Sequence, residues 1–194
     1  MRRLAFCCLC LLIVGSSCSP KLKTVAVEPT EKVIDWQGHR GARGLLPENS
    51  IPAFRKALEY PAIRTLELDV VISADSQVVV SHEPWLAALF CSHPDGRAVT
   101  EEEEKSLRLL RMTLAEIQAF DCGSRGNAKF PEQLPVATVK PTLAAVAEAA
   151  DLHARSLERP LPFYNIEIKS RPDWDDTYTP QPERFAELVL AAIK

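Results

Sequence analysis

The sequence contains no long run of basic residues, and its 194 residues carry a formal net charge of −3. Without a basic stripe there is no electrostatic footprint for a nucleic acid, so nucleic acid is not expected as a partner. The short acidic run EEEEK at residues 101–105 is expected to be a solvated surface segment. The chain is 46% hydrophobic and 25% charged, which is the composition of a domain with an ordinary buried core.

The sequence also lacks a hydrophobic run long enough to cross a membrane as a mature helix. Its apolar run LAFCCLCLLIV (residues 4–14) follows two arginines, which is typical of a secretory signal. Small residues then lead to Cys18, as in a bacterial lipoprotein signal, although Gly15 stands where an aliphatic residue is usual. We predict a lipoprotein-type signal peptide over residues 1–18, with an ordinary secretory signal cleaved nearby as the alternative.

That prediction places the chain outside the cytoplasm. We expect an exported protein of the periplasm or cell surface, with membrane contact through a lipid anchor at Cys18 and a polar tether over residues 19–32. Cysteine is scarce beyond the signal, where only Cys91 and Cys122 are present. Two such cysteines can form a disulfide in an oxidising compartment, but the sequence alone does not establish the pairing.

Strand and helix patterns alternate after residue 33. The periodicity predicts strands over residues 33–39, 64–72, 78–82 and 162–170 and helices over residues 47–60, 113–123, 142–158 and 182–194. The second and third strands are expected to form a hairpin, and Asn49 or Ser50 is expected to cap the first helix. This alternation is typical of a parallel α/β fold, whose ligands bind at the C-terminal ends of the strands.

Two of these strands carry charged side chains among aliphatic residues. Within LELDV, Glu67 and Asp69 stand two residues apart, so both point to the same face of the strand. Two adjacent carboxylates repel each other and are costly to bury unless a cation pairs with them. Glu167 and Lys169 repeat the pattern within NIEIK. Three carboxylates suit a hard divalent cation, Ca²⁺ or Mg²⁺; the alternative is an exposed strand face with scattered charges.

Two of the four histidines, His39 and His82, each end an apolar strand. Beside a carboxylate cluster they suggest a general acid and a general base, whereas either one alone is often only a polar strand terminus. Arg40 offers a planar fork for phosphate oxygens, and Lys169 offers a point charge. The three glycines of QGHRGARG are expected to let the backbone bend and a ligand approach closely.

Taken in order, HRGARGLLPENS, ELDV, VVVSHEP and NIEIK resemble the glycerophosphodiester phosphodiesterase family, from about Gln37 to the C-terminus. The resemblance implies a (β/α)₈ TIM barrel and a divalent cation, Ca²⁺ or Mg²⁺. It also implies hydrolysis of deacylated phospholipids, such as glycerophosphocholine, to glycerol 3-phosphate and an alcohol. By matching positions it implies catalytic His39 and His82, metal ligands Glu67, Asp69 and Glu167, phosphate contacts Arg40 and Lys169, and a supporting residue Glu48.

Chain length and two alternatives qualify that resemblance. A (β/α)₈ barrel typically needs about 250 residues, so residues 33–194 are expected to form only the N-terminal half of one, with about four barrel strands and an insertion around residues 86–135. A phosphatidylinositol-type phospholipase uses a similar barrel and histidine pair, although the carboxylates of ELDV and NIEIK favour the first family. A non-catalytic surface lipoprotein that binds phosphorylated glycerol is the second alternative.

Overall fold

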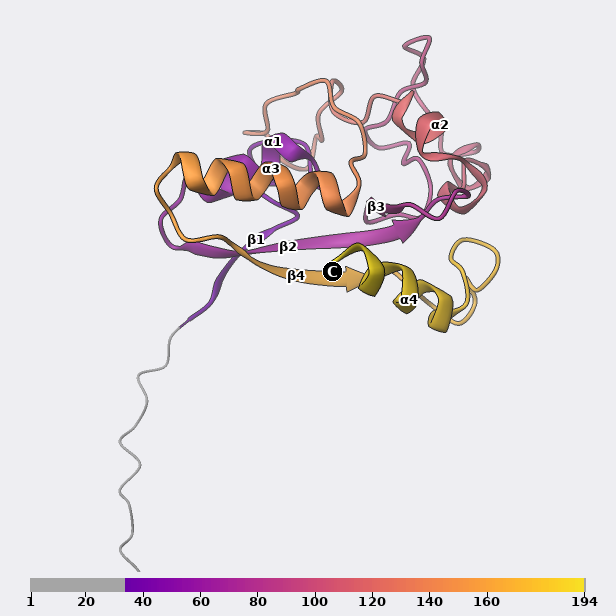
Figure 1. The fold of residues 1–194 in the computed structure, drawn as a ribbon. Helices are drawn as coiled ribbons and strands as arrows, with labels where there is room; N and C mark the ends of the chain where they lie inside the picture. The colour runs from indigo at the N-terminus through magenta and orange to yellow at the C-terminus, as the bar shows by residue number, and fades with distance from the viewer. Residues whose placement is uncertain (1–33, 194) are drawn as a thin grey trace, which may run out of the picture. The chain divides into compact units, whose positions relative to one another are not determined.

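The structure of the chain is a computed structural model that describes residues 34–193 (Figure 1). The predicted signal peptide, the lipidation site Cys18 and the predicted tether lie outside the described residues and stay predictions. Within residues 34–193, no helix combines the length and the apolar character that crossing a membrane requires.

One strand, β2, pairs with every other strand of the described sheet. β2 (Ile63–Ile72) runs parallel to β1 (Trp36–His39) and to β4 (Phe163–Ile168), and it forms an antiparallel pair with β3 (Val78–Val80). All four predicted strands are therefore present, including the hairpin. Because β3 turns back along β2, the parallel part of the sheet has three strands rather than the four expected.

Four α-helices accompany the sheet in the described part of the chain. They are α1 (Ile51–Leu58), α2 (Leu114–Gln118), α3 (Leu143–Ser156) and α4 (Pro182–Ala192), with short 3₁₀ helices at Glu104–Ser106 and Leu109–Arg111. Ser50 caps α1 by accepting a hydrogen bond from the Ala53 N–H. Thr113 and Glu116 form a capping box on α2. These side chains satisfy backbone N–H groups that a helix end leaves without partners.

The main core lies between the sheet and the helices. The aliphatic positions of β2 that alternate with the acids are fully buried, and they pack with apolar residues of α1, α3 and α4. Figure 1 shows α1 and α3 side by side over β1 and β2. This packing fixes one face of β2 inward, so the acidic face must point the other way.

The segment between β3 and α3 has a core of its own. Its buried apolar residues gather around Leu86, Leu109 and Ile117 and pack on Val71 and Val79 of the hairpin. A disulfide joins Cys91 and Cys122 within this cluster, so the pairing that the sequence left open is present. The segment is thus held to the sheet by apolar contacts and closed internally by a covalent bond.

Candidate functional site

Three carboxylates converge at the predicted position. Glu67 and Asp69 share one face of β2, and Asp69 is the register partner of Glu167 on the neighbouring parallel strand. One oxygen of each carboxylate lies within 4.8 Å of the others. The predicted meeting of these three acids is therefore confirmed as geometry. The alternative of scattered charges is contradicted for Asp69, which is fully buried, although Glu167 remains 55% exposed.

Asp69 is the best-supported carboxylate of the three. Its Oδ2 accepts a hydrogen bond of 2.9 Å from the Asn49 amide and lies 3.2 Å from Arg40 Nε. Its Oδ1 lies 3.2 Å from Lys169 Nζ but has no hydrogen-bond partner among the described residues. Burial raises the pKa of Asp69, but the Asn49 hydrogen bond and the two cations outweigh burial and lower it. Asp69 is thus an ionised, buried carboxylate with spare acceptor capacity.

Lys169 lies against two of the acids. Its ammonium donates to Glu167 Oε1 at 2.6 Å and forms the ion pair with Asp69. Burial lowers the pKa of Lys169, but these two carboxylates outweigh burial and raise it. The lysine is therefore a fixed positive charge at the C-terminal end of β4, where it was predicted to contact phosphate.

The turn after β1 brings His39 and Arg40 to the same acids. The Arg40 N–H donates to Glu67 Oε2 at 2.8 Å, and His39 Nε2 lies 3.8 Å from that oxygen. Arg40 adopts a left-handed backbone conformation with φ of 52°, which is uncommon for a residue with a side chain. The His39 imidazole is more than half exposed, so it faces the open side of the cluster.

Two glycines of this turn, Gly38 and Gly41, lie against helix α1. Gly41 has φ of 78°, and a Cβ there would lie 2.7 Å from the Ala53 backbone carbon of α1. A Cβ on Gly38 would lie 2.9 Å from the Ala57 Cβ. Both glycines therefore let the backbone pass close to helix α1, and the positive φ of Gly41 confirms the bend that was expected of this turn.

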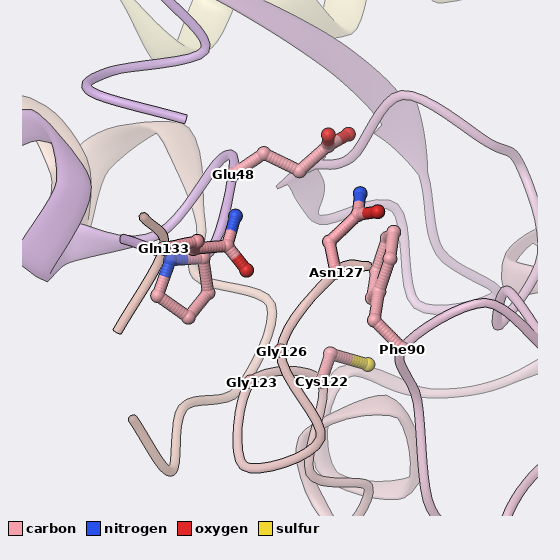
Figure 2. Close-up of a pocket in the computed structure, with 8 residues that line it drawn as sticks. Glu48, Phe90, Cys122, Gly123, Gly126, Asn127 and Gln133 are labelled. Atoms are coloured by element: carbon pink, nitrogen blue, oxygen red, sulfur yellow. The ribbon is translucent and has the colours of Figure 1, made fainter. Parts of the chain in front are cut away.

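Glu48 joins two arginines beside the cluster. Its Oε1 accepts from Arg40 Nη1 at 2.8 Å, and its Oε2 pairs with Arg43 Nη2 at 2.9 Å. Glu48 therefore orients Arg40, as a supporting residue would. Figure 2 shows Glu48 at a narrow pocket whose other walls come from Pro47 and from the segment between β3 and α3. The lining residues are Pro47, Glu48, Phe90, Cys122, Gly123, Gly126, Asn127 and Gln133. The segment between β3 and α3 therefore lies directly beside Glu48.

His82 has a carboxylate partner, Glu83, to which the sequence analysis assigned no role. Its Nδ1 lies 2.7 Å from Glu83 Oε1. Burial raises the pKa of Glu83, but the His82 hydrogen bond and nearby cations lower it to about 2. An ionised carboxylate only accepts hydrogen bonds. In the neutral ring Nδ1 therefore carries the hydrogen, and Nε2 is the nitrogen that can accept a proton. The signal for this pair was the acid that directly follows the histidine in VVVSHEP.

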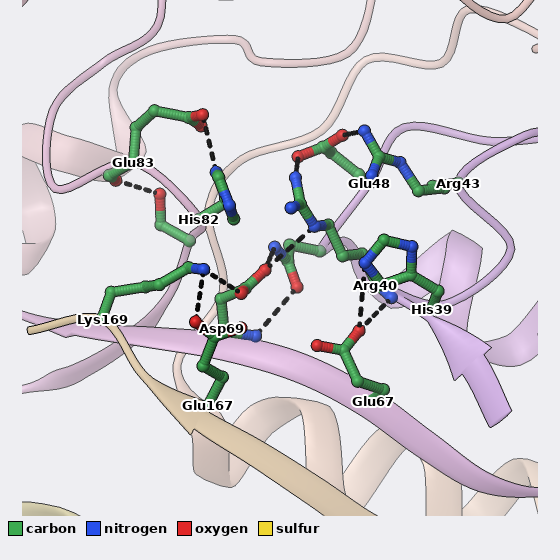
Figure 3. A network of polar contacts seen from close by, with 12 residues as sticks. His39, Arg40, Arg43, Glu48, Glu67, Asp69, His82, Glu83, Glu167 and Lys169 are labelled. Carbon is green, nitrogen blue, oxygen red and sulfur yellow. Dashed lines mark hydrogen bonds and ion pairs between the residues drawn. The ribbon is translucent and has the colours of Figure 1, made fainter.

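Figure 3 shows the predicted residues of the site in one view. The residues brought together are His39, Arg40, Glu48, Glu67, Asp69, His82, Glu167 and Lys169. Seven of them are linked by the contacts described above, whereas the one side-chain partner of His82 within residues 34–193 is Glu83. Three contributors were not predicted: Arg43, Asn49 as a partner of Asp69, and Glu83.

Comparisons with known proteins identify the family of this chain. Residues 39–176 match the glycerophosphoryl diester phosphodiesterase family. A glycerophosphodiester phosphodiesterase from Bacillus subtilis (strain 168) is 30% identical over 150 residues, which cover 76% of this chain and 42% of that protein. The chain therefore spans less than half the length of this relative.

Solved structures give the same result for the fold. A crystal structure from Silicibacter pomeroyi DSS-3, which carries a glycerophosphoryl diester phosphodiesterase name, has a TM-score of 0.70 at 30% identity, over 83% of this chain and 53% of that one. Glycerophosphodiester phosphodiesterase from Agrobacterium tumefaciens str. C58 has a TM-score of 0.51 at 25% identity, over 81% and 53%. The predicted fold class, α/β of the (β/α)₈ barrel type with part of the barrel present, is confirmed.

Proposed function

Because the chain belongs to the glycerophosphoryl diester phosphodiesterase family, we propose that it hydrolyses glycerophosphodiesters, such as glycerophosphocholine, to glycerol 3-phosphate and an alcohol. The observation that carries the proposal is the convergence of Glu67, Asp69 and Glu167, with one oxygen of each within 4.8 Å of the others. The alternation of β2 and the parallel register of β4 create this convergence, and the imidazoles and cations that phosphodiester chemistry needs surround it.

The three carboxylates fit a divalent cation, Ca²⁺ or Mg²⁺. All donors are hard oxygens, and the buried Asp69 Oδ1 faces only the Lys169 ammonium, at 3.2 Å, in the described part of the chain. When bound, such an ion would polarise a phosphoryl oxygen and favour ionisation of a nearby hydroxyl. Arg40 and Lys169 are the proposed phosphate contacts, because both are fixed cations at the edge of the carboxylate cluster.

The two histidines are the proposed proton-transfer groups. In the first step a glycerol hydroxyl attacks the phosphorus and gives its proton to one imidazole, while the other imidazole protonates the departing alcohol. Water then opens the cyclic phosphate with the roles exchanged. Glu83 favours His82 as the group that first accepts a proton, since a carboxylate at Nδ1 stabilises the imidazolium that forms when Nε2 is protonated.

The same proposal includes an exported, lipid-anchored protein of the periplasm or cell surface, with Cys18 as the anchor. Its support is the apolar run before Cys18 together with the Cys91–Cys122 disulfide, because structural disulfides persist mainly in oxidising compartments. Metabolic labelling with a fatty-acid analogue tests it: label should appear in the wild-type chain and be absent from Cys18→Ala.

Activity is tested by release of glycerol 3-phosphate from glycerophosphocholine, with and without EDTA. We expect metal-dependent release that falls roughly a hundredfold or more in His82→Gln and in His39→Gln. His153→Gln on α3, outside the network of Figure 3, is the matched control and should retain activity. Faster cleavage of phosphatidylinositol would favour the phospholipase alternative. Saturable binding of glycerol 3-phosphate with no turnover under any metal would favour the non-catalytic one.

A further inference from the structure

Lys140 carries a charged side chain into the interior, at a position that the proposed chemistry does not use. The residue is 6% exposed. Its backbone is fixed at the start of α3, because its carbonyl accepts from the Gln118 amide at 3.2 Å and the next carbonyl, of Pro141, accepts from the Val80 N–H at 2.8 Å. Burying an ammonium is strongly unfavourable unless charges and hydrogen bonds compensate it. The compensating groups should therefore lie close to the side chain.

The hydrogen-bond partner of Lys140 is the residue that precedes His82. Lys140 Nζ donates to Ser81 Oγ at 2.8 Å, and this hydroxyl in turn donates to the Glu83 carbonyl at 2.6 Å. An ammonium only donates hydrogen bonds, so the Ser81 hydroxyl must accept from Lys140. The single hydrogen of this hydroxyl is then available for the Glu83 carbonyl. Ser81 is fully buried, and its N–H donates to the Asp69 carbonyl at 2.9 Å. These bonds close the turn that presents His82.

The compensating charges are carboxylates of the site. Burial lowers the pKa of Lys140 below its ordinary value, and the charges of Glu83, Glu48 and Asp69, in this order, offset only part of that effect. Conversely, the charge of Lys140 is one of the causes that hold the pKa of Glu83 at about 2, after the His82 hydrogen bond and charge. Glu83 Oε2 is buried without a hydrogen-bond partner in the described structure. The positive charge of Lys140 therefore adds to the effect of His82 in keeping this carboxylate ionised.

We propose that Lys140 is a positioning residue for His82, which acts through the Ser81 hydroxyl on the turn and through its charge on the Glu83 carboxylate that holds the imidazole. The proposal rests on the proposed role of His82 in proton transfer. Glu83 fixes which ring nitrogen carries the hydrogen, and Lys140 fixes Glu83 and the backbone around it. Lys140 itself contacts neither the carboxylate cluster nor a substrate in this arrangement.

The test is the tautomeric state of His82, measured by ¹⁵N NMR of the full chain labelled at histidine. His82→Gln identifies the resonances. In the wild type the neutral ring should carry its hydrogen at Nδ1. In Lys140→Met, which removes the charge and shortens the side chain by one heavy atom, a measurable share should move to the Nε2–H tautomer. The titration midpoint of the Glu83 carboxyl should also rise, by about one pH unit. Lys129→Met, at an exposed lysine of the same segment, is the control and should match the wild type.

A second variant covers the case in which Lys140→Met does not fold. Ser81→Ala removes the linking hydroxyl and keeps the charge, so the tautomer share should change while the Glu83 midpoint stays low. Wild-type tautomer and midpoint in folded Lys140→Met, or a wild-type tautomer in Ser81→Ala, would overturn the proposal. Neither readout requires turnover. A chain that does not hydrolyse glycerophosphodiesters but shows the tautomer change would contradict the proposed function and retain the role of Lys140.

Discussion

At the residue scale, Asn49 combines two tasks. Its backbone is left-handed, with φ of 54°, and its side-chain amide donates to Asp69 at 2.9 Å. Asparagine tolerates this conformation better than most residues. Of the two residues predicted to cap α1, Ser50 is the cap. The Asn49 side chain binds Asp69 instead.

Substitution of Asn49 separates these tasks. Asn49→Gly keeps the conformation and removes the hydrogen bond, so we expect a loss of about 1–2 kcal/mol in unfolding free energy. Asn49→Ala should lose about 1 kcal/mol more, because a side chain without a polar group is strained at positive φ. Urea denaturation of both variants measures the difference. Equal stability of the two variants would contradict the strain argument.

Glu83 makes stability depend on pH. Its pKa is about 2 in the folded chain against an ordinary value of 4.5, so the unfolded chain binds the proton more readily. Its contribution is therefore fully present above pH 4.5 and is lost as the pH falls towards 2. Glu83→Gln should be less stable than the wild type at pH 6, and its stability should fall less steeply between pH 4.5 and 2. Denaturation at several pH values measures both slopes, and parallel curves would contradict this prediction.

At the scale of elements, the segment between β3 and α3 is stapled and packed as a unit. The disulfide closes a loop with a sequence separation of 31, and Cys122 also lines the pocket beside Glu48. Loosening this segment should therefore affect both stability and the support of Arg40. Breaking such a cross-link raises the conformational entropy of the unfolded chain, and this gain in entropy is larger for a long loop.

Removal of the disulfide gives a direct measure. We expect Cys91→Ala/Cys122→Ala to lose about 3–4 kcal/mol of unfolding free energy, from the loop-entropy relation for a loop of this length. Each single substitution should cost a similar amount, since either one breaks the bond. Unchanged stability in the double variant would mean that the apolar cluster holds the segment without help.

Strand periodicity predicted the elements and the acids, because alternation fixes both the burial and the direction of side chains. It predicted Glu67, Asp69 and Glu167 for that reason. It could not predict Lys140, which lies 59 residues after its partner Ser81 in a proline-rich segment without periodicity. Nor could it predict that Gly38 and Gly41 lie against α1, because this tertiary contact is not contained in any local pattern.

At the scale of the whole molecule, the sheet formed by the described residues has two edges without a partner strand. Among residues 34–193, β1 and β4 pair only with β2. Apolar hollows adjoin both strands, one of about 380 Å³ beside Trp36 and Tyr60 and one of about 570 Å³ beside Phe163. Trp36 and Phe163 are 58% and 63% exposed. Open edges with exposed aromatic side chains favour pairing with another chain.

We therefore expect residues 34–193 to self-associate as concentration rises. Sedimentation should show an increasing average mass for the wild type, and Trp36→Lys/Phe163→Lys should reduce the association because charged side chains protect sheet edges. Leu152→Lys, at a 59% exposed position on α3, is the matched control and should associate like the wild type. A monomer at all concentrations would contradict this prediction.

The central position of β2 has a consequence for how the molecule opens. Its 10 residues supply one side of every backbone ladder in the described sheet, and they also supply Glu67 and Asp69. A local unfolding event that detaches β2 must therefore break every ladder of the sheet. An opening event that leaves the sheet intact cannot separate Glu67 from Asp69. In amide hydrogen exchange, β2 should be the last segment to take up deuterium. The unfolding event that exposes its amides should also be the one that separates the carboxylates of the site.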